Sequence, residues 1–159
     1  MSQEKRGRKG VSARESESQE RETIEYTGEL NFEELSEFVK EHGFDNLLNM
    51  SAGELRELLL GVKGIGPETA DSIVLYAFEK PTFVIDAYTK RIFSRLGLCD
   101  SDVDYHVLQK RFMDELEKDV SLFNEYHALI VEHAKRHCKT KPECKNCPLK
   151  VQWRRRLVC

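Results

Sequence analysis

Three cysteines near the C-terminal end of the chain have the spacing of metal ligands. They are Cys138, Cys144 and Cys147, and a proline precedes the second and follows the third. In a reducing cytosol such a cluster indicates a metal site rather than disulfides. Zinc and an iron–sulfur cluster are both chemically possible, and the spacing alone slightly favours zinc. A further thiol, Cys159, follows after eleven residues and could loop back as the fourth ligand.

The segment that carries these cysteines is strongly basic. From residue 134 to the end there are nine Lys and Arg residues and only one acid, although the whole chain has 28 acids, 25 bases and a formal charge of −3. A basic segment on an otherwise acidic chain favours a polyanionic partner, with a solvated tail as the alternative. Several bases around the cysteines are expected to face phosphates: Lys135, Arg136, Lys139, Lys141 and Lys145.

A glycine-rich turn in the middle of the chain could bind an anion. The sequence Gly61-Val62-Lys63-Gly64-Ile65-Gly66 lies between two predicted helices, and Pro67 opens the second. Glycines can take positive φ in such a turn, and the free N–H groups and dipole at a helix start favour negative charge. The amides of Gly64 and Gly66 could approach a phosphate, while Ile65 is expected to pack into the core. An ordinary corner between two helices is the alternative.

An aspartate follows twenty residues after this turn. Asp86 stands after three apolar residues and before a predicted helix, and the simplest interpretation is that it caps this helix. A carboxylate at the end of a hydrophobic run can also stabilise a cationic sugar or deprotonate water, as carboxylates do in glycoside cleavage. The two roles are compatible.

Helices must position these groups, because apolar residues recur with helical spacing from residue 31 onward and no segment alternates convincingly as a strand. The predicted fold class is therefore all-α. Helices are expected from Asn31 to the stop at Gly43, from a capping box of Ser51 and Glu54, over 67–78, from Asp86 to Gly97, over 103–118 and over 121–137.

Three regions are expected along the chain. Residues 1–28 are polar and charged and are predicted to be disordered, residues 29–137 form the helical domain, and residues 138–159 form the cysteine-rich basic loop. There is no apolar run long enough to cross a membrane and no secretory signal in the first residues. We therefore expect a soluble, cytoplasmic, monomeric protein.

The motifs together resemble a known family. The pattern of residues 60–70, Leu-Gly-Val-Lys-Gly-Ile-Gly-Pro-x-Thr-Ala, resembles a helix-hairpin-helix DNA-binding motif. With the Val-Ile-Asp that ends at Asp86, the chain resembles the helix-hairpin-helix/Gly-Pro-Asp superfamily of DNA glycosylases, and within it the endonuclease III group, from about residue 31 to residue 149. The resemblance implies a helix-hairpin-helix helical domain with a C-terminal cysteine loop.

The resemblance also implies a partner and site residues. The partner is double-stranded DNA that contains damaged bases, in the nucleoid, and Asp86 matches the catalytic aspartate of the family. The expected DNA contacts are Lys63, Gly64, Ile65, Gly66, Thr69 and Lys145. Family hairpins also hold a monovalent cation through backbone carbonyls, and the matching positions are Leu60, Val62 and Ile65.

For the cysteines, the resemblance implies a 4Fe–4S cluster. The run Cys-x5-Cys-x2-Cys-Pro-Leu resembles the opening of the family's cluster motif, with Cys138, Cys144 and Cys147 as ligands. Trp153 occupies the family's usual fourth cysteine position, which leaves Cys159 as the candidate fourth ligand or the cluster degraded or absent.

One departure from the family pattern bears on the reaction. Bifunctional members form a Schiff base through a lysine two residues after the second hairpin glycine, where this chain has Glu68, and a carboxylate cannot form one. This predicts a monofunctional, water-using base-excision repair glycosylase, near the branch that acts on alkylated purines such as 3-methyladenine.

Two alternatives remain open. The first is a bifunctional glycosylase/AP lyase that uses a displaced lysine. The second is a non-catalytic helix-hairpin-helix DNA-binding module, because family members usually have a longer helical segment before the hairpin. The chain is accordingly expected to be a member that is truncated at its N-terminal side.

Overall fold

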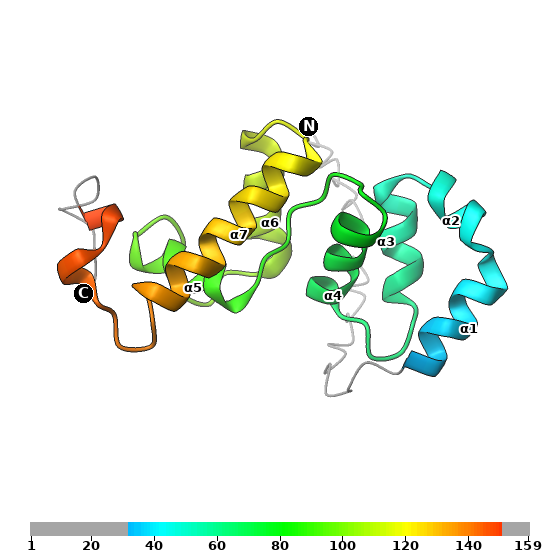
Figure 1. Cartoon of the computed structure of the whole chain (residues 1–159), viewed down its shortest axis with the longest axis horizontal. Coiled ribbons are helices and arrows are strands. Elements are labelled where there is room, and N and C mark those ends of the chain that lie inside the picture. Colours follow the sequence, from blue (N-terminus) through cyan, green and yellow to red (C-terminus); the bar gives the residue numbers. More distant parts are fainter. Residues whose placement is uncertain (1–31, 151–159) are drawn as a thin grey trace, which may run out of the picture.

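The structure is a computed structural model of the chain, and it describes residues 32–150. Every regular element in that range is helical, which confirms the predicted all-α class. Figure 1 shows the helices in two lobes, one at each side of a connecting segment without regular structure. In the described range, no helix combines the length and the apolar character that a membrane crossing requires. The expected tail over 1–28 and the candidate ligand Cys159 lie outside the described residues.

The first lobe contains the glycine-rich turn. Its helices are α1 (Phe32–His42), α2 (Phe44–Asn49), α3 (Ala52–Leu60) and α4 (Pro67–Ser72), and α4 continues as a π-helical turn, η1 (Ile73–Ala77). The predicted capping box is confirmed: the Glu54 amide donates to the Ser51 hydroxyl and the Ser51 amide donates to the Glu54 carboxylate. The sequence did not predict α2, which starts directly after Gly43 turns the chain with a φ of 74°.

The second lobe contains the long helix that ends at the cysteines. Its helices are α5 (Ala87–Arg95), α6 (Tyr105–Glu115) and α7 (Val120–Arg136), followed by the short 3₁₀ turns η2 (Cys144–Asn146) and η3 (Pro148–Lys150). α6 is shorter than the predicted span of 103–118. Asp104 caps its start by accepting from the amides of His106 and Val107, and Leu116 is already extended at its end.

Each lobe has its own hydrophobic core. Ile65 from the glycine-rich turn packs in the first core with Leu47, Leu55, Leu59 and Val74. In the second core the Phe83 ring stacks on Phe112 at a centroid distance of 4.0 Å and meets Phe123 edge-on at 5.4 Å. Phe83 belongs to the connecting segment, which is buried from residue 82 to residue 86. The segment that leads to Asp86 is therefore part of the second core.

A buried carboxylate joins the two lobes. Asp71 on α4 is fully buried and accepts hydrogen bonds from Arg56 Nε at 2.7 Å, Tyr105 Oη at 2.7 Å, Gln109 Nε2 at 2.8 Å and Thr82 Oγ1 at 3.1 Å. These donors come from α3, from α6 and from the connecting segment. A buried charge is tolerated only when it is paired and hydrogen-bonded, and Asp71 meets that requirement with donors from both lobes.

The first prediction concerns this carboxylate. Asp71→Asn should lower the free energy of unfolding by about 3 kcal/mol or more, because the nearly buried Arg56 guanidinium loses its charged partner. Urea unfolding followed by circular dichroism measures the change. Asp114→Asn is the matched control, since its ion pair with Lys110 is solvent-exposed and should contribute less than about 0.5 kcal/mol. Equal small changes in the two variants would show that Asp71 does not hold the lobes together.

Candidate active site

The glycine-rich turn is fixed by backbone hydrogen bonds. The Val62 amide donates to the Leu59 carbonyl at 3.0 Å, and the Ile65 amide donates to the Val62 carbonyl at 3.1 Å. Gly64 has a φ of 85°, which confirms the expected positive φ at that position. At Gly66 the expectation is wrong: its φ is −89°, because this residue is the extended N-cap of α4.

The turn presents polar groups on the surface and an anchor in the core. Ile65 is fully buried, as predicted, whereas Lys63 is exposed and Thr69 is half-buried. Within the described residues the amides of Gly64 and Gly66 donate to no backbone carbonyl. They are therefore available to an anion such as a phosphate oxygen, with the ammonium group of Lys63 nearby in the turn. Whether the carbonyls of Leu60, Val62 and Ile65 hold a cation stays a prediction.

Asp86 is the N-cap of α5, as predicted, and it is 9 % exposed. Its Oδ1 accepts from the Thr89 amide at 2.6 Å and from the Thr89 hydroxyl at 2.7 Å. Its other oxygen, Oδ2, lies 3.4 Å from Nε2 of His127 on α7. The Tyr76 hydroxyl of η1 is in turn 2.6 Å from Nδ1 of the same imidazole. One oxygen of the aspartate thus serves the helix, while the other faces a histidine.

Sequence reasoning missed His127 and Tyr76. His127 is a single histidine inside a long amphipathic helix, and Tyr76 is one aromatic residue in another, 51 positions away in the sequence. Nothing in their spacing signals the contact. Only the packing of α7 against η1 brings the two side chains together beside Asp86.

Two carboxylates of the site have pKa values displaced in opposite directions. Burial raises the pKa of Asp86, but the adjacent imidazole of His127 and the hydrogen bonds from Thr89 outweigh it and hold the pKa below its ordinary value. For Glu68 in the first turn of α4, partial burial and the negative charge of Asp86 raise the pKa, against smaller opposing effects of His127 and Lys90. Asp86 is therefore ionised at neutral pH, the state that a base or an electrostatic stabiliser of a cation requires.

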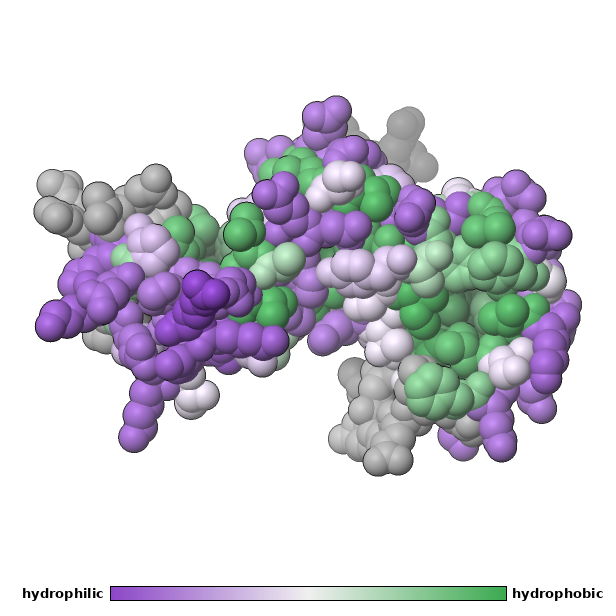
Figure 2. Space-filling model, viewed as in Figure 1, coloured by the Kyte–Doolittle hydropathy of each residue, from purple (hydrophilic) through white to green (hydrophobic). Residues whose placement is uncertain are grey.

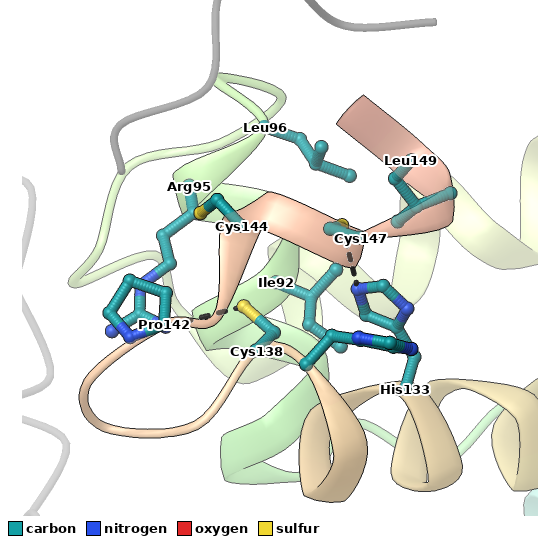
Figure 3. A pocket seen from close by; sticks show the side chains of 10 residues that line it. Ile92, Arg95, Leu96, His133, Cys138, Pro142, Cys144, Cys147 and Leu149 are labelled. Atoms are coloured by element: carbon teal, nitrogen blue, oxygen red, sulfur yellow. Dashed lines mark hydrogen bonds between the residues drawn. The ribbon is translucent and has the colours of Figure 1, made fainter. Parts of the chain in front are cut away.

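The three cysteines of the C-terminal segment line one small pocket. Figure 3 shows Cys138, Cys144 and Cys147 around it. Arg95 donates to Cys138 Sγ at 3.2 Å and to the carbonyl oxygens of the loop that follows, and Nε2 of His133 is 3.7 Å from Cys147 Sγ. The pocket has a volume of about 20 Å³, and its other lining residues are Ile92, Leu96, His137, Pro142 and Leu149.

Cysteine thiolates are typical ligands of zinc and of iron–sulfur clusters. Cys138 and Cys147 are free thiols that line this pocket, and an Arg95 N–H points at the Cys138 sulfur, as hydrogen-bond partners of thiolate ligands do, whereas Cys144 is disulfide-bonded. Among residues 32–150, however, no three metal-binding side chains lie close enough together to form a ligand set. The described residues thus bring the three predicted cysteines to one pocket without arranging them around a metal position.

The bases around the cysteine loop are on the surface. Figure 2 shows hydrophilic side chains over this end of the molecule, whereas hydrophobic side chains gather over the lobe of α1–α4. Lys145 is exposed, as a phosphate contact requires. Lys139 is bound to Glu143 at 2.7 Å, and Arg136 is bound to Glu132 on α7. Local carboxylates therefore partly neutralise two of the expected phosphate-facing bases.

The chain is similar in sequence to known proteins. The protein named "Putative DNA repair glycosylase MJ1434" from Methanocaldococcus jannaschii is 52 % identical over 96 residues, which are 60 % of this chain and 44 % of that protein. Endonuclease III from Sulfolobus acidocaldarius is 32 % identical over 104 residues, 65 % of this chain and 46 % of that protein. The chain thus spans less than half the length of these curated relatives. No protein-family model matches the chain.

Solved structures support the fold. A structure described as a non-covalent endonuclease III–DNA complex superimposes with a TM-score of 0.53, at 19 % sequence identity, over 76 % of this chain and 72 % of that chain. A trapped covalent endonuclease III–DNA intermediate gives a TM-score of 0.52 at the same identity, over 78 % of this chain and 76 % of that chain. The described helices therefore have the helix-hairpin-helix arrangement of endonuclease III.

Proposed function

Because the chain belongs to the helix-hairpin-helix superfamily of DNA glycosylases, we propose that it excises damaged bases from duplex DNA by hydrolysing the N-glycosidic bond. The observation that carries the proposal is the placement of Asp86. It is ionised, only 9 % exposed and fixed at the start of α5. Its Oδ1 accepts hydrogen bonds from Thr89, whereas its Oδ2 takes no part in capping the helix.

The glycine-rich turn supplies the positioning half of the proposal. The available amides of Gly64 and Gly66, with Lys63 beside them, bind backbone phosphates without reading sequence. Thr69 and Lys145 extend this contact. The damaged base is rotated out of the stack, as an enzyme that acts on a base in a duplex requires. Phosphate binding at the turn then fixes the sugar of the flipped nucleotide relative to Asp86.

Asp86 supplies the chemical half. Its Oδ2 stabilises the positive charge that develops on the sugar as the glycosidic bond breaks, and it takes a proton from the attacking water. An anion held in a partly desolvated position interacts more strongly with such a cation than an anion in water does. The nearby Glu68 adds a second carboxyl group, which takes up a proton more readily than Asp86 because its pKa is raised.

We further propose that the reaction uses water and not a lysine. Glu68 stands where the bifunctional members of the superfamily have their Schiff-base lysine. Lys80 is committed to the Leu48 carbonyl at 2.8 Å. An alkylated purine such as 3-methyladenine is the proposed substrate, since its ring is cationic while attached to the sugar, departs as a neutral base with the glycosidic electron pair, and needs little help beyond the charge of Asp86. The enzyme would act as a monomer in the cytoplasm, on nucleoid DNA.

We also propose a 4Fe–4S cluster bound by Cys138, Cys144 and Cys147, with Cys159 as the fourth ligand. The shared pocket of the three described cysteines and the Arg95 N–H to sulfur support it, and Cys144, which is disulfide-bonded in this structure, would bind in its reduced form. When bound, the cluster would cross-link the loop to the C-terminal end of α7, which Cys138 follows. Within the chain, Arg95 already ties α5 to this loop through the carbonyls of residues 139 and 140, and Lys145 lies on the loop so held.

The second prediction tests the role of Asp86. Asp86→Asn should lower the rate of base release from methylated duplex DNA by at least about 100-fold, because the amide can still cap α5 but can neither accept a proton nor oppose a cation. DNA affinity should stay unchanged or improve, since a negative charge near phosphates is removed. Chromatography of released bases and fluorescence anisotropy measure the two quantities.

Asp104→Asn is the matched control for this variant. Asp104 caps α6 in the same way, through the amides of His106 and Val107, but it lies at a different helix start. This control should release bases at the rate of the unchanged protein. Normal turnover by Asp86→Asn would refute the catalytic role, and DNA binding without base release by the unchanged protein would favour the non-catalytic module.

The third prediction concerns the cluster. Protein purified without oxygen should be brown, with broad absorbance near about 400 nm from thiolate-ligated iron. Cys147→Ser should lose both the colour and part of the folding stability, because the ligands tie the loop to the helices. Cys99→Ser, in the loop after α5, should keep the colour. A colourless protein with stoichiometric zinc would contradict the iron–sulfur proposal, although the assignment of the cysteines as metal ligands would remain valid.

A further inference from the structure

The contact between Asp86 and His127 is not explained by the fold alone. Oδ1 of Asp86 is occupied by Thr89, so the cap of α5 is complete without Oδ2. Oδ2 faces Nε2 of His127 at 3.4 Å, and the exposed fractions of the two side chains are only 11 % and 13 %. Nε2 is buried and, among the described residues, has no hydrogen-bond partner of good geometry. A ring nitrogen therefore points at the one aspartate oxygen that is left for chemistry.

Tyr76 sets the direction of this ring. Its hydroxyl lies 2.6 Å from Nδ1 of His127, and the two rings are tilted at 47° with centroids 6.2 Å apart. A hydroxyl that donates to Nδ1 leaves the proton on Nε2, where it faces Asp86. Tyr76 lies in η1, a π-helical turn, and such turns occur frequently at functional sites.

We propose that His127, oriented by Tyr76, is a positioning residue that holds Oδ2 of Asp86 toward the scissile bond. The inference rests on the proposed glycosylase function and deepens it. Catalytic hydrogen bonds are often long without substrate and tighten in the complex, which fits the 3.4 Å separation. A carboxylate that is fixed at both oxygens pays less orientational entropy when the flipped nucleotide arrives.

The groups that face His127 come from three elements. Asp86 lies at the start of α5, Tyr76 in η1 and Glu68 in α4. The imidazole lowers the pKa of Asp86, so its removal should raise that pKa. Because Asp86 must be ionised to act, activity should then be lost at a higher pH as the solution is acidified. A residue that only fills space would leave this acid limb in place.

The fourth prediction uses His127→Ala, His127→Gln and Tyr76→Phe, with duplex DNA treated with a methylating agent as the probe. His127→Ala should lower kcat for base release at least about tenfold with little change in KM, and should move the acid limb of kcat/KM to higher pH. His127→Gln should recover most of the rate, because its amide nitrogen can occupy the place of Nε2. Tyr76→Phe should give an intermediate loss.

The control is His42→Gln, because His42 contacts Phe38 on α1 rather than Asp86. It should behave as the unchanged protein. A His127→Ala variant with normal kcat and an unmoved acid limb would overturn the inference. An equal loss of kcat in His127→Ala and His127→Gln, with a lowered thermal unfolding temperature and an unmoved acid limb, would also overturn the inference. That outcome is expected if His127 only packs against its neighbours.

A second measurement separates this inference from the proposed function. The Asp86 carboxyl can be titrated by NMR in the free protein, with Asp86→Asn to assign the signal. Its pKa should rise in His127→Ala and return toward the original value in His127→Gln. An unchanged pKa overturns the positioning role, whether or not the protein excises a base. Absence of base release from every tested duplex overturns the proposed function instead.

Discussion

The position of the candidate active site depends on the buried carboxylate of Asp71. The glycine-rich turn belongs to the first lobe, whereas the segment that ends at Asp86 packs into the second. Arg56 binds Asp71 from α3, and Tyr105 and Gln109 bind it from α6. Gln109 also donates to the Phe83 carbonyl at 2.8 Å. One polar network thus joins the lobe of the glycine-rich turn to the lobe of the aspartate, and such a network is costly to leave incomplete in the interior.

The Asp86 carboxylate performs a structural task, and we propose a chemical task for it as well. Its Oδ1 caps α5 through Thr89, which fixes the carboxyl plane, and its Oδ2 stays directed at the imidazole of His127. The hydrogen bonds that make the cap also keep the group ionised against the effect of burial. The features that stabilise the helix therefore also maintain the charge that the proposed bond cleavage needs. Glu68 stands at the family's lysine position and cannot form a Schiff base, which supports the proposal that water is the nucleophile.

The sequence predicts those features that are encoded over a few residues. The capping box of Ser51 and Glu54, the positive φ at Gly64, the buried Ile65 and the cap at Asp86 each depend on neighbours within one helical turn, and the structure has all four. The resemblance to endonuclease III likewise rests on a short run of residues, and the superimposed helices agree with it.

Features that depend on packing between distant elements could not be predicted in this way. Asp71 is an ordinary polar residue in a helical pattern until Gln109, 38 positions later, meets it, and the Tyr76–His127 contact spans 51 positions. The prediction for Gly66 failed because local reasoning treats every hairpin glycine alike, whereas the start of α4 already fixes that residue in an extended conformation. The cysteine spacing identified the lining of one pocket, but spacing carries no information on ligand geometry.

The central claim is that Asp86 uses water to release a base and leaves the DNA backbone intact. The most direct measurement separates these two events on one end-labelled duplex that carries a methylated purine. After incubation, half of the sample is treated with alkali, and a parallel sample contains borohydride. The account predicts free base, strands that break only after alkali, and no protein trapped on DNA. Strand breakage without alkali together with trapped protein would contradict it and establish a lysine-dependent lyase.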